Sequence, residues 1–167
     1  IINILQGKVK YIYLTHCHGD HILGTTELKE KMGGKILIHR DDSEGLNNKD
    51  INLTEIIGMG RIELEADSRI DDGDLLHLGE LEFKVIHTPG HTPGGVCYYL
   101  ESEDVLFSGD TLFRASVGRT DFKASNHNDL LQSIKEKLYA LPDDTMVYPG
   151  HMSATTIEFE KKHNPFV

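Results

Sequence analysis

Four potential metal ligands occupy six consecutive positions near the start of the chain. His16, His18, Asp20 and His21 follow an apolar run at residues 11–14 that predicts a buried strand. Alternate side chains of an extended segment point the same way, so His16 and His18 can bind one ion together. Asp20 and His21 follow, where the chain turns into a helix, and can reach a second ion. Zinc-type ions take imidazole nitrogens and carboxylate oxygens, so the cluster predicts a metal site.

Three further candidate ligands follow strand-like segments later in the chain. "LEFKVIHTPGH" and "TMVYPGH" each run from an apolar strand through Pro-Gly to a histidine, His91 and His151, and "LFSGD" delivers Asp110 in the same way. Open α/β sheets carry ligand chemistry on loops at strand ends. Each signal is weak alone, but two imidazoles and a carboxylate that can bridge complete the ligands of a two-metal hydrolytic site. Such sites hold their ions about 3.5–4 Å apart.

Other reactive or aromatic side chains receive structural interpretations. Cys17 lies between two ligands and is expected to point away from them, and Cys17 and Cys97 are expected to be thiols. Phe113, Phe122 and Tyr148 are expected in the core rather than in a substrate wall. The remaining histidines are interpreted as surface residues or as supports of the ligands, with His87 as the main exception: His39, His77, His87, His127 and His163.

The elements that position these residues follow an α/β pattern of short apolar strands and helices. A polar stretch at residues 41–60 indicates a loop with a short helix. A helix is expected whose apolar face includes Leu130, Ile134 and Leu138, with Ser125 or Asn126 as its N-cap. Strands are expected at 11–14, 35–39, 62–65, 75–79, 81–87, 96–100, 105–108 and 145–148, and the other helices at 22–32, closed by Gly33 and Gly34, and at 155–163.

Size and charge narrow the function classes. The 167 residues suit one domain with a core, and 38% hydrophobic and 26% charged residues are typical of soluble globular proteins. A net charge of −10 with no Lys/Arg stripe disfavours a nucleic-acid partner. No apolar run approaches the ~20 residues of a membrane helix, so no membrane partner is expected. No signal peptide is visible, which favours a cytoplasmic protein, although the chain begins at Ile1 rather than Met.

Four motifs in this order resemble the metallo-β-lactamase-fold hydrolases: "THCHGDH", "TPGHTPG", "FSGDT" and "YPGH". "GDTLFRASVGRTDF" and the ending "TTIEFEKKHNPF" resemble the single-domain, glyoxalase II-like subgroup, the hydroxyacylglutathione hydrolase-like enzymes. The resemblance runs through essentially the whole chain. It implies an α/β fold, the αββα sandwich, as one domain over residues 1–167. It also implies that one metal is held by His16, His18 and His91, the other by Asp20, His21 and His151, and that Asp110 bridges them.

The implied activity is metal-dependent thioester hydrolysis. Two divalent ions, zinc first with iron or manganese as alternatives, would provide a hydroxide that attacks the carbonyl of a hydroxyacyl thioester of glutathione or a similar thiol. Asp20 would orient that hydroxide as the catalytic residue. Arg119 and Arg114 are candidate contacts for a substrate carboxylate. The favoured alternative for Arg119 is a structural turn pairing with Asp121.

The chain departs from the family pattern in two places. Only residues 1–10, which look like the end of a helix, precede the first motif, so the domain is expected to be N-terminally incomplete and to lack its first strands. Met152 and Ser153 stand where the subgroup commonly has Gly-Pro.

One alternative function is an iron-dependent persulfide dioxygenase, whose relatives hold a single iron at the equivalents of His16, His91 and Asp110. The remote alternative is a non-catalytic binding module of the same fold.

Overall fold

A computed structural model describes residues 8–58, 60 and 62–167 and divides the chain into two compact units, Ile1–Ile70 and Asp71–Val167. The helix end expected within residues 1–10 falls mostly outside the described residues, and residues 8–10 have no regular secondary structure. No helix among the described residues combines the length and the hydropathy needed to cross a bilayer.

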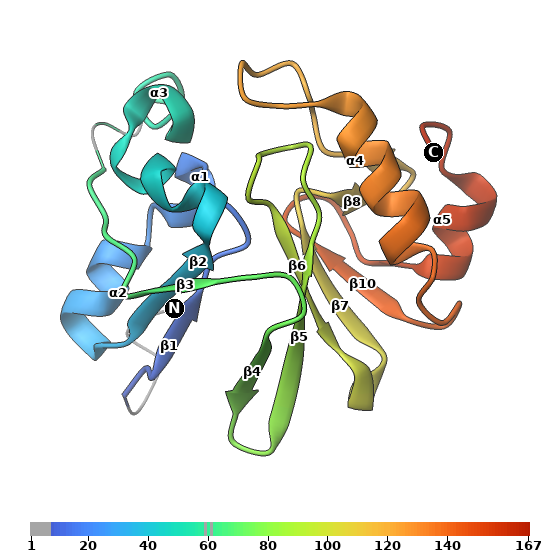
Figure 1. The fold of residues 1–167 in the computed structure, drawn as a ribbon, viewed down its shortest axis with the longest axis horizontal. Coiled ribbons are helices and arrows are strands. Elements are labelled where there is room, and N and C mark those ends of the chain that lie inside the picture. Colours follow the sequence, from blue (N-terminus) through green and yellow to red (C-terminus); the bar gives the residue numbers. More distant parts are fainter. Residues whose placement is uncertain (1–7, 59, 61) are drawn as a thin grey trace. The chain divides into compact units, whose positions relative to one another are not determined.

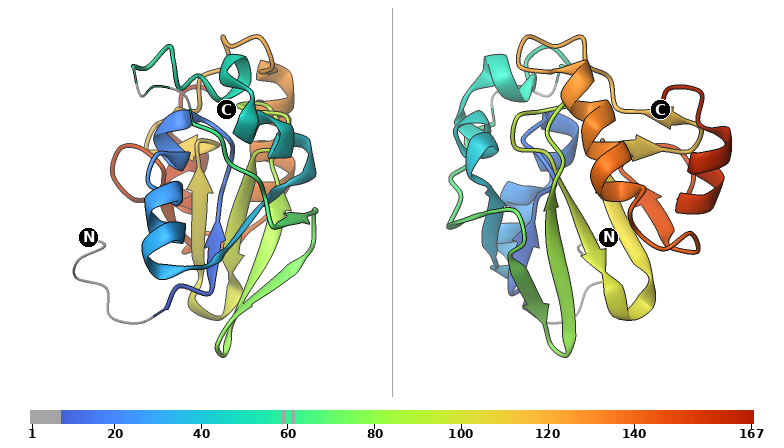
Figure 2. Two further views of the ribbon diagram at one scale, coloured as in Figure 1. Left: turned by 90° about the vertical axis from the view of Figure 1, so that its left-hand side faces the viewer. Right: turned by 45° about the vertical axis from the view of Figure 1, so that its right-hand side comes forward.

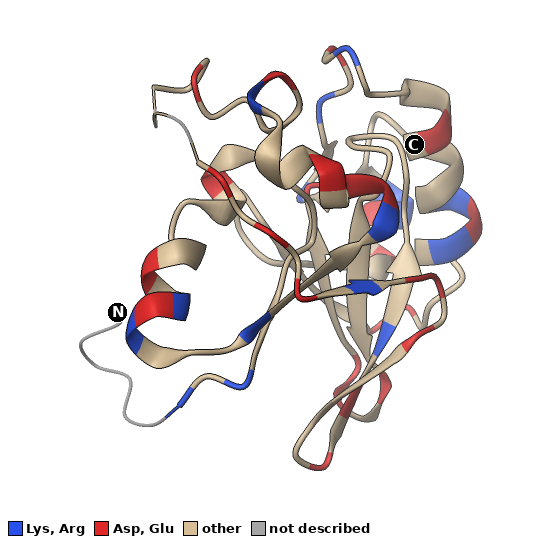
Figure 3. Cartoon of the chain, turned by 60° about the vertical axis from the view of Figure 1, so that its left-hand side comes forward, with Lys and Arg blue, Asp and Glu red and all other residues tan. Residues whose placement is uncertain are grey.

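The first unit is built around a parallel three-stranded sheet in the order β1-β2-β3 (Figure 1). Its buried core includes Ile12, Leu14, Ile22, Ile36 and Ile38. Its helix α2 carries both acidic and basic residues, among them Glu27, Lys29 and Lys31. Figure 3 marks the acidic and basic positions of the chain by colour on the cartoon. The elements are β1 (Tyr11–Tyr13), α1 (Gly19–Ile22), α2 (Thr25–Met32), β2 (Lys35–His39), the 3-10 helix η1 (Arg40–Asn47), α3 (Lys49–Asn52) and β3 (Ser68–Ile70).

Two sequence expectations change in this unit. The helix expected at 22–32 is two helices, α1 and α2. Gly33 ends the second one as expected, at a positive φ of 78° that favours glycine. The strand expected at 62–65 is wrong, because the third strand begins at Ser68. Asp67 explains the shift: its N–H donates to the Ile36 carbonyl (2.9 Å), and its carboxylate accepts from the Ile36 N–H (2.8 Å). These two hydrogen bonds to β2 fix the position at which β3 begins to pair with it.

The second unit contains a six-stranded sheet in the order β11-β10-β7-β6-β5-β4. β10 pairs with β7 in parallel and the other pairs are antiparallel. The elements are β4 (Leu75–Leu78), β5 (Leu81–His87), β6 (Val96–Leu100), the 3-10 helix η2 (Glu101–Glu103), β7 (Val105–Gly109), the small β8–β9 hairpin (Leu112–Phe113 and Ser116–Val117), α4 (His127–Ser133), its π-helical continuation η3 (Ile134–Leu138), β10 (Met146–Pro149), β11 (Thr155–Thr156) and α5 (Ile157–His163).

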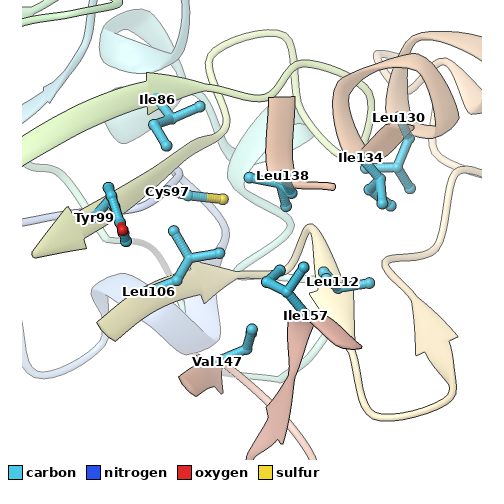
Figure 4. Close-up of a cluster of buried hydrophobic side chains, with 10 residues drawn as sticks. All are labelled: Ile86, Cys97, Tyr99, Leu106, Leu112, Leu130, Ile134, Leu138, Val147 and Ile157. Atoms are coloured by element: carbon cyan, nitrogen blue, oxygen red, sulfur yellow. The ribbon is translucent and has the colours of Figure 1, made fainter. Parts of the chain in front are cut away.

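Helices α4 and α5 lie against one face of this sheet (Figures 1 and 2). Leu130, Ile134 and Leu138 are fully buried, as the helical spacing predicts, and they pack with sheet residues such as Leu106 in the cluster of Figure 4. Asn126, one of the two predicted caps, accepts hydrogen bonds from the first turn of α4. The core is therefore built on the helix-facing side chains of the sheet.

The opposite face of the sheet carries aromatic side chains. Phe107 is 42% exposed and stacks on Tyr148, which is 45% exposed, with ring centroids 5.8 Å apart. The expectation that Tyr148 lies in the core is therefore wrong. Successive strand residues point to opposite faces, so Tyr148 turns outward because its neighbour Val147 turns inward. Phe113, by contrast, is buried as expected.

Candidate metal centre

The first unit gathers an N-terminal quartet, defined as His16, His18, Asp20 and His21, between β1 and the end of α1. The imidazole rings of His16 and His18 meet edge to face with centroids 4.9 Å apart, and those of His16 and His21 are 4.1 Å apart. His21 Nε2 lies 3.7 Å from Asp20 Oδ2. His16 and His18 are buried while Asp20 is exposed. The strand-to-helix turn thus concentrates three imidazoles and a carboxylate, as the spacing predicts.

A buried carboxylate from η1 supports the loop that carries the quartet. Asp42 Oδ2 accepts the Cys17 N–H (3.0 Å), between the first two histidines. The Cys17 side chain is buried in the apolar core, where a Cβ at Gly45 would meet its Sγ at 2.4 Å. Burial, followed by the charge of Asp42, raises the pKa of the Cys17 thiol. The cysteine therefore packs into the core as an inert thiol, as expected.

The second unit gathers a C-terminal trio, defined as His91, Asp110 and His151, on three separate loops. One carboxylate oxygen, Asp110 Oδ2, lies 3.6 Å from His91 Nε2 and 3.5 Å from His151 Nε2. Both separations exceed the usual 2.7–3.2 Å of an N–H···O hydrogen bond. Both imidazoles therefore lie at a spacing from the carboxylate oxygen that leaves room for an ion between the ligand atoms.

The hydrogen bond of His91 decides which of its nitrogens can bind an ion. His91 Nδ1 lies 2.7 Å from the Arg119 carbonyl oxygen. A carbonyl only accepts, so Nδ1 carries the hydrogen and Nε2 keeps its lone pair in the neutral imidazole. Nε2 is the atom that faces Asp110. Metal-binding histidines are typically held by such a bond from the other ring nitrogen.

The loop of His91 is held by the start of α4. Gly90 adopts φ 140°, where a Cβ would meet the Leu130 backbone nitrogen at 2.3 Å, so the close approach requires glycine. The Asn126 N–H donates to the Gly90 carbonyl (2.8 Å), and the Ser125 hydroxyl donates to the His91 carbonyl (2.7 Å). The glycine of the "TPGH" motif therefore allows the His91 loop to pack directly against the start of α4.

Gly118 likewise permits a close approach of two chain segments, here beside Asp110. A Cβ at Gly118 would lie 1.8 Å from the Asp110 carbonyl oxygen and 3.3 Å from His91 Nδ1. The segment after the β8–β9 hairpin can therefore pass against both ligands only with glycine at this position. Asp42 and Gly118 were not predicted from the sequence, because each acts through a contact far along the chain and neither lies in a motif that marks it.

The two arginines proposed for substrate contact have partners in the second unit. Arg119 donates two hydrogen bonds to the Asp121 carboxylate (2.7 and 2.6 Å), which is the turn pairing expected from the sequence, and these bonds lower the Asp121 pKa to about 2. Its guanidinium also covers the Phe122 ring at 4.4 Å. Arg114 covers the Phe159 ring and donates to the Ala154 carbonyl. Both side chains are exposed.

Two of the other histidines have structural roles. His39, expected at the surface or as a support of the ligands, is buried and caps η1 by accepting the Asp41 N–H. His87 Nε2 donates to the Pro93 carbonyl (2.8 Å), which closes the loop around His91. His77, His127 and His163 are exposed, in agreement with the surface interpretation. Cys97 is a buried thiol like Cys17.

The donor atoms of the quartet and the trio fit divalent metal ions. They comprise imidazole nitrogens and carboxylate oxygens, and the one imidazole whose tautomer the structure fixes turns its lone pair toward the shared carboxylate. The family model of the metallo-beta-lactamase superfamily matches residues 1–151. The chain belongs to the metallo-β-lactamase superfamily. The α/β fold predicted from the motifs is that of the superfamily.

Curated relatives in the superfamily extend the match. The chain is 37% identical over 157 residues to the probable metallo-hydrolase YqgX of Bacillus subtilis, covering 93% of this chain and 74% of the relative. It is 36% identical over 175 residues to the hydroxyacylglutathione hydrolase GloC of Haemophilus influenzae, covering 99% and 79%. Membership and the ligand chemistry together indicate a metal-dependent hydrolase.

Solved structures of superfamily members match the fold closely. BLEG-1, a B3 metallo-β-lactamase, superposes with a TM-score of 0.89 at 39% identity and covers 94% of this chain and 76% of that one. TTHA1623 in a di-iron-bound form has a TM-score of 0.83 at 34% identity, with 94% and 77% covered. ETHE1 from Myxococcus xanthus has a TM-score of 0.76 at 32% identity, with 95% and 62% covered.

Proposed function

We propose that the N-terminal quartet and the C-terminal trio bind one pair of divalent ions and that the protein hydrolyses hydroxyacyl thioesters of a small thiol. The observation that carries the proposal is the position of Asp110 Oδ2, 3.5–3.6 Å from the Nε2 atoms of two histidines on different loops. A carboxylate shared between two imidazoles is the arrangement that a bridging ligand of a two-metal hydrolase needs.

The ligands divide into two sets in this proposal. His16, His18 and His91 would hold the first ion, Asp20, His21 and His151 would hold the second, and Asp110 would be a ligand of both. The residues that would hold the first ion are all buried, whereas Asp20 and His151, which would hold the second, are exposed to solvent. Zinc is the first choice of metal, and iron is the strongest alternative because TTHA1623 is known in a di-iron-bound form.

Bound ions would supply a nucleophile at neutral pH, since a metal lowers the pKa of water from 15.7 to about 7 and polarises the carbonyl. The residues of the chain do the positioning. Asp20 is the exposed carboxylate of the quartet, and it orients the attacking water and takes its proton. A thiolate leaving group needs little acid assistance, so one carboxylate suffices. We therefore assign Asp20 the catalytic proton transfer.

The substrate class follows from similarity and charge. GloC is named a hydroxyacylglutathione hydrolase, and it matches nearly the whole of this chain. Arg119 and Arg114 are exposed cations in the same unit as the trio, suited to the carboxylates of a glutathione-like carrier. Arg119 is held by Asp121, so a substrate carboxylate would have to share its guanidinium. Two buried thiols accord with a reducing, cytoplasmic compartment.

Two other activities have a specific observation behind them. The likeness to ETHE1 favours a persulfide dioxygenase, which would need a single iron and oxygen. The likeness to BLEG-1 favours hydrolysis of a β-lactam ring. Both remain second to thioester hydrolysis, because the chain retains the ligands of two ions and carries Asp110 where strict β-lactamases tend to place Cys or Ser.

The test is metal removal and return on the full chain. Chelated, dialysed protein should lose hydrolysis of a hydroxyacyl-glutathione thioester, and two equivalents of zinc should restore it. His91→Ala should stay inactive, whereas His77→Ala, an exposed histidine outside the proposed site, should behave as wild type. Full turnover after chelation would end the proposal. Oxygen uptake with glutathione persulfide, or cleavage of a β-lactam without thioester hydrolysis, would replace it with the corresponding alternative.

A further inference from the structure

Glu160, on helix α5, is a fully buried carboxylate that is not one of the candidate ligands. Its two oxygens accept the Ala115 N–H (3.1 and 3.0 Å), the Thr155 hydroxyl (2.6 Å) and the Asn164 side-chain amide (2.8 Å). Burying a charge is costly unless hydrogen bonds compensate it, and three donors converge on this one. Such an arrangement fixes the donors in position as strongly as it fixes the carboxylate.

Two of these donors belong to the segments that follow Asp110 and His151. Ala115 forms the turn of the β8–β9 hairpin, five residues after Asp110, and holds a left-handed φ of 52° that a non-glycine residue adopts only with support. Thr155 begins β11, four residues after His151. Glu160 is thus a direct link between the two loops that carry these ligands.

The near ends of the same two loops are already joined by the backbone. The Gly150 N–H donates to the Gly109 carbonyl (2.8 Å), immediately before His151 and Asp110. Each ligand therefore lies between a backbone anchor on one side and Glu160 on the other. Removing Glu160 would take away the buried side-chain link at the far ends of both loops and leave the near ends attached. The pairing of β10 with β11 and the Arg114 bond to the Ala154 carbonyl would remain, so the loops would loosen rather than detach.

We propose that Glu160 is a positioning residue that sets the separation between His151 and Asp110 and thereby the affinity for the ion that His151 binds. Asn164 assists it by donating to the Ser116 carbonyl (3.0 Å) beside Ala115. This inference rests on the proposed metal centre. Among its ligands, His151 and Asp110 lie on the two loops that Glu160 links, whereas His91 lies on a loop held by the start of α4. The second ion should therefore depend on Glu160 far more than the first.

The experiment compares Glu160→Met with Glu158→Met by zinc and cobalt titration of metal-free protein, followed calorimetrically and by the cobalt absorption spectrum. Both changes replace a glutamate on α5 with the same apolar residue, but Glu158 is exposed and pairs with Lys162. Glu160→Met should bind the second ion about 10–100-fold more weakly, the usual effect of losing a support of a ligand, and should weaken the first ion, which shares only Asp110, far less. Glu158→Met should bind both normally.

A conservative change gives a second readout. In Glu160→Gln the amide oxygen can accept from Ala115 and Asn164 while the amide nitrogen donates to the Thr155 hydroxyl, so most of the second-ion affinity should return. Should Glu160→Met not fold, Thr155→Val, which removes the single 2.6 Å bond, decides in its place and should weaken the same ion selectively.

The outcomes separate this inference from the proposed function. Wild type binding two ions while Glu160→Met, or Thr155→Val in its place, binds both with unchanged affinity would overturn the role of Glu160 alone. Equal weakening of both ions would also overturn it, because that is the signature of general destabilisation. Wild type binding fewer than two ions would overturn the two-ion centre and this inference with it.

Discussion

Replacing Gly118 with alanine should disturb the trio without touching a ligand side chain. The new Cβ would lie 1.8 Å from the Asp110 carbonyl oxygen, and a Cβ essentially never approaches a backbone atom closer than 3.0 Å. The Asp110 backbone and the Gly118 segment must therefore separate by at least 1.2 Å. His91 is affected as well, since its Nδ1 is 3.3 Å from the same point and bonds the carbonyl of the next residue, Arg119.

This displacement predicts a loss of catalytic rate. A misplacement of about 1 Å in a catalytic constellation costs about 100-fold in rate, or about 2.7 kcal/mol of transition-state stabilisation. Overpacking itself costs about 1–3 kcal/mol of folding stability. The assays are kcat/KM for the thioester with saturating zinc, and urea denaturation to confirm that the variant is folded.

Gly24→Ala is the matched control. Its added Cβ meets nothing within 4 Å, and its φ of −84° suits any residue, so activity should be unchanged and stability within about 1 kcal/mol of wild type. Folded Gly118→Ala with wild-type kcat/KM would refute the inference that this close contact holds the ligands in place.

Three further predictions concern stability. Asn126→Ala removes the N-cap of α4 and should cost about 0.5–2 kcal/mol in urea denaturation; no loss would show that the cap is replaceable. Asp42→Ala leaves the buried Cys17 N–H without its acceptor and should cost about 1–3 kcal/mol by the same assay, and an unchanged midpoint would contradict this. Burial raises the Cys97 pKa from 9.0 to about 11, so the thiol ionises at a lower pH in the unfolded chain than in the folded one. The free energy of unfolding should therefore fall by up to about 3 kcal/mol as the pH rises from 9 to 11. The free energy of unfolding of Cys97→Ala should fall less over this range, and an equal fall would refute the prediction.

The sequence predicted most elements of the fold because their signals are local. The helix of Leu130, Ile134 and Leu138, its cap at Asn126, and the strand-to-loop steps before His91 and Asp110 are all written in short stretches. The third strand was misplaced because the Asp67 clamp to Ile36 acts across more than thirty residues. Alternation alone did not show that Tyr148 would face outward.

The candidate ligands could likewise be predicted from short motifs, whereas the residues that support them could not. Pro-Gly-His and Gly-Asp motifs name His91, His151 and Asp110 directly. Glu160 and Gly118 gain their roles only when the β8–β9 hairpin folds back beside Asp110, because the relevant contacts join residues distant in sequence. The sequence does not distinguish a buried glutamate on a charged helix, such as Glu160, from an exposed one, such as Glu158.

Anomalous diffraction from crystals of the zinc-loaded protein tests the central claim most directly. We expect two peaks about 3.5–4 Å apart, with imidazole nitrogens and carboxylate oxygens at about 2.0–2.2 Å and Asp110 in contact with both. The expected ligands are His16, His18, Asp20, His21, His91, Asp110 and His151. A single peak, or two peaks with the quartet and the trio on separate ions, would contradict a shared two-metal centre.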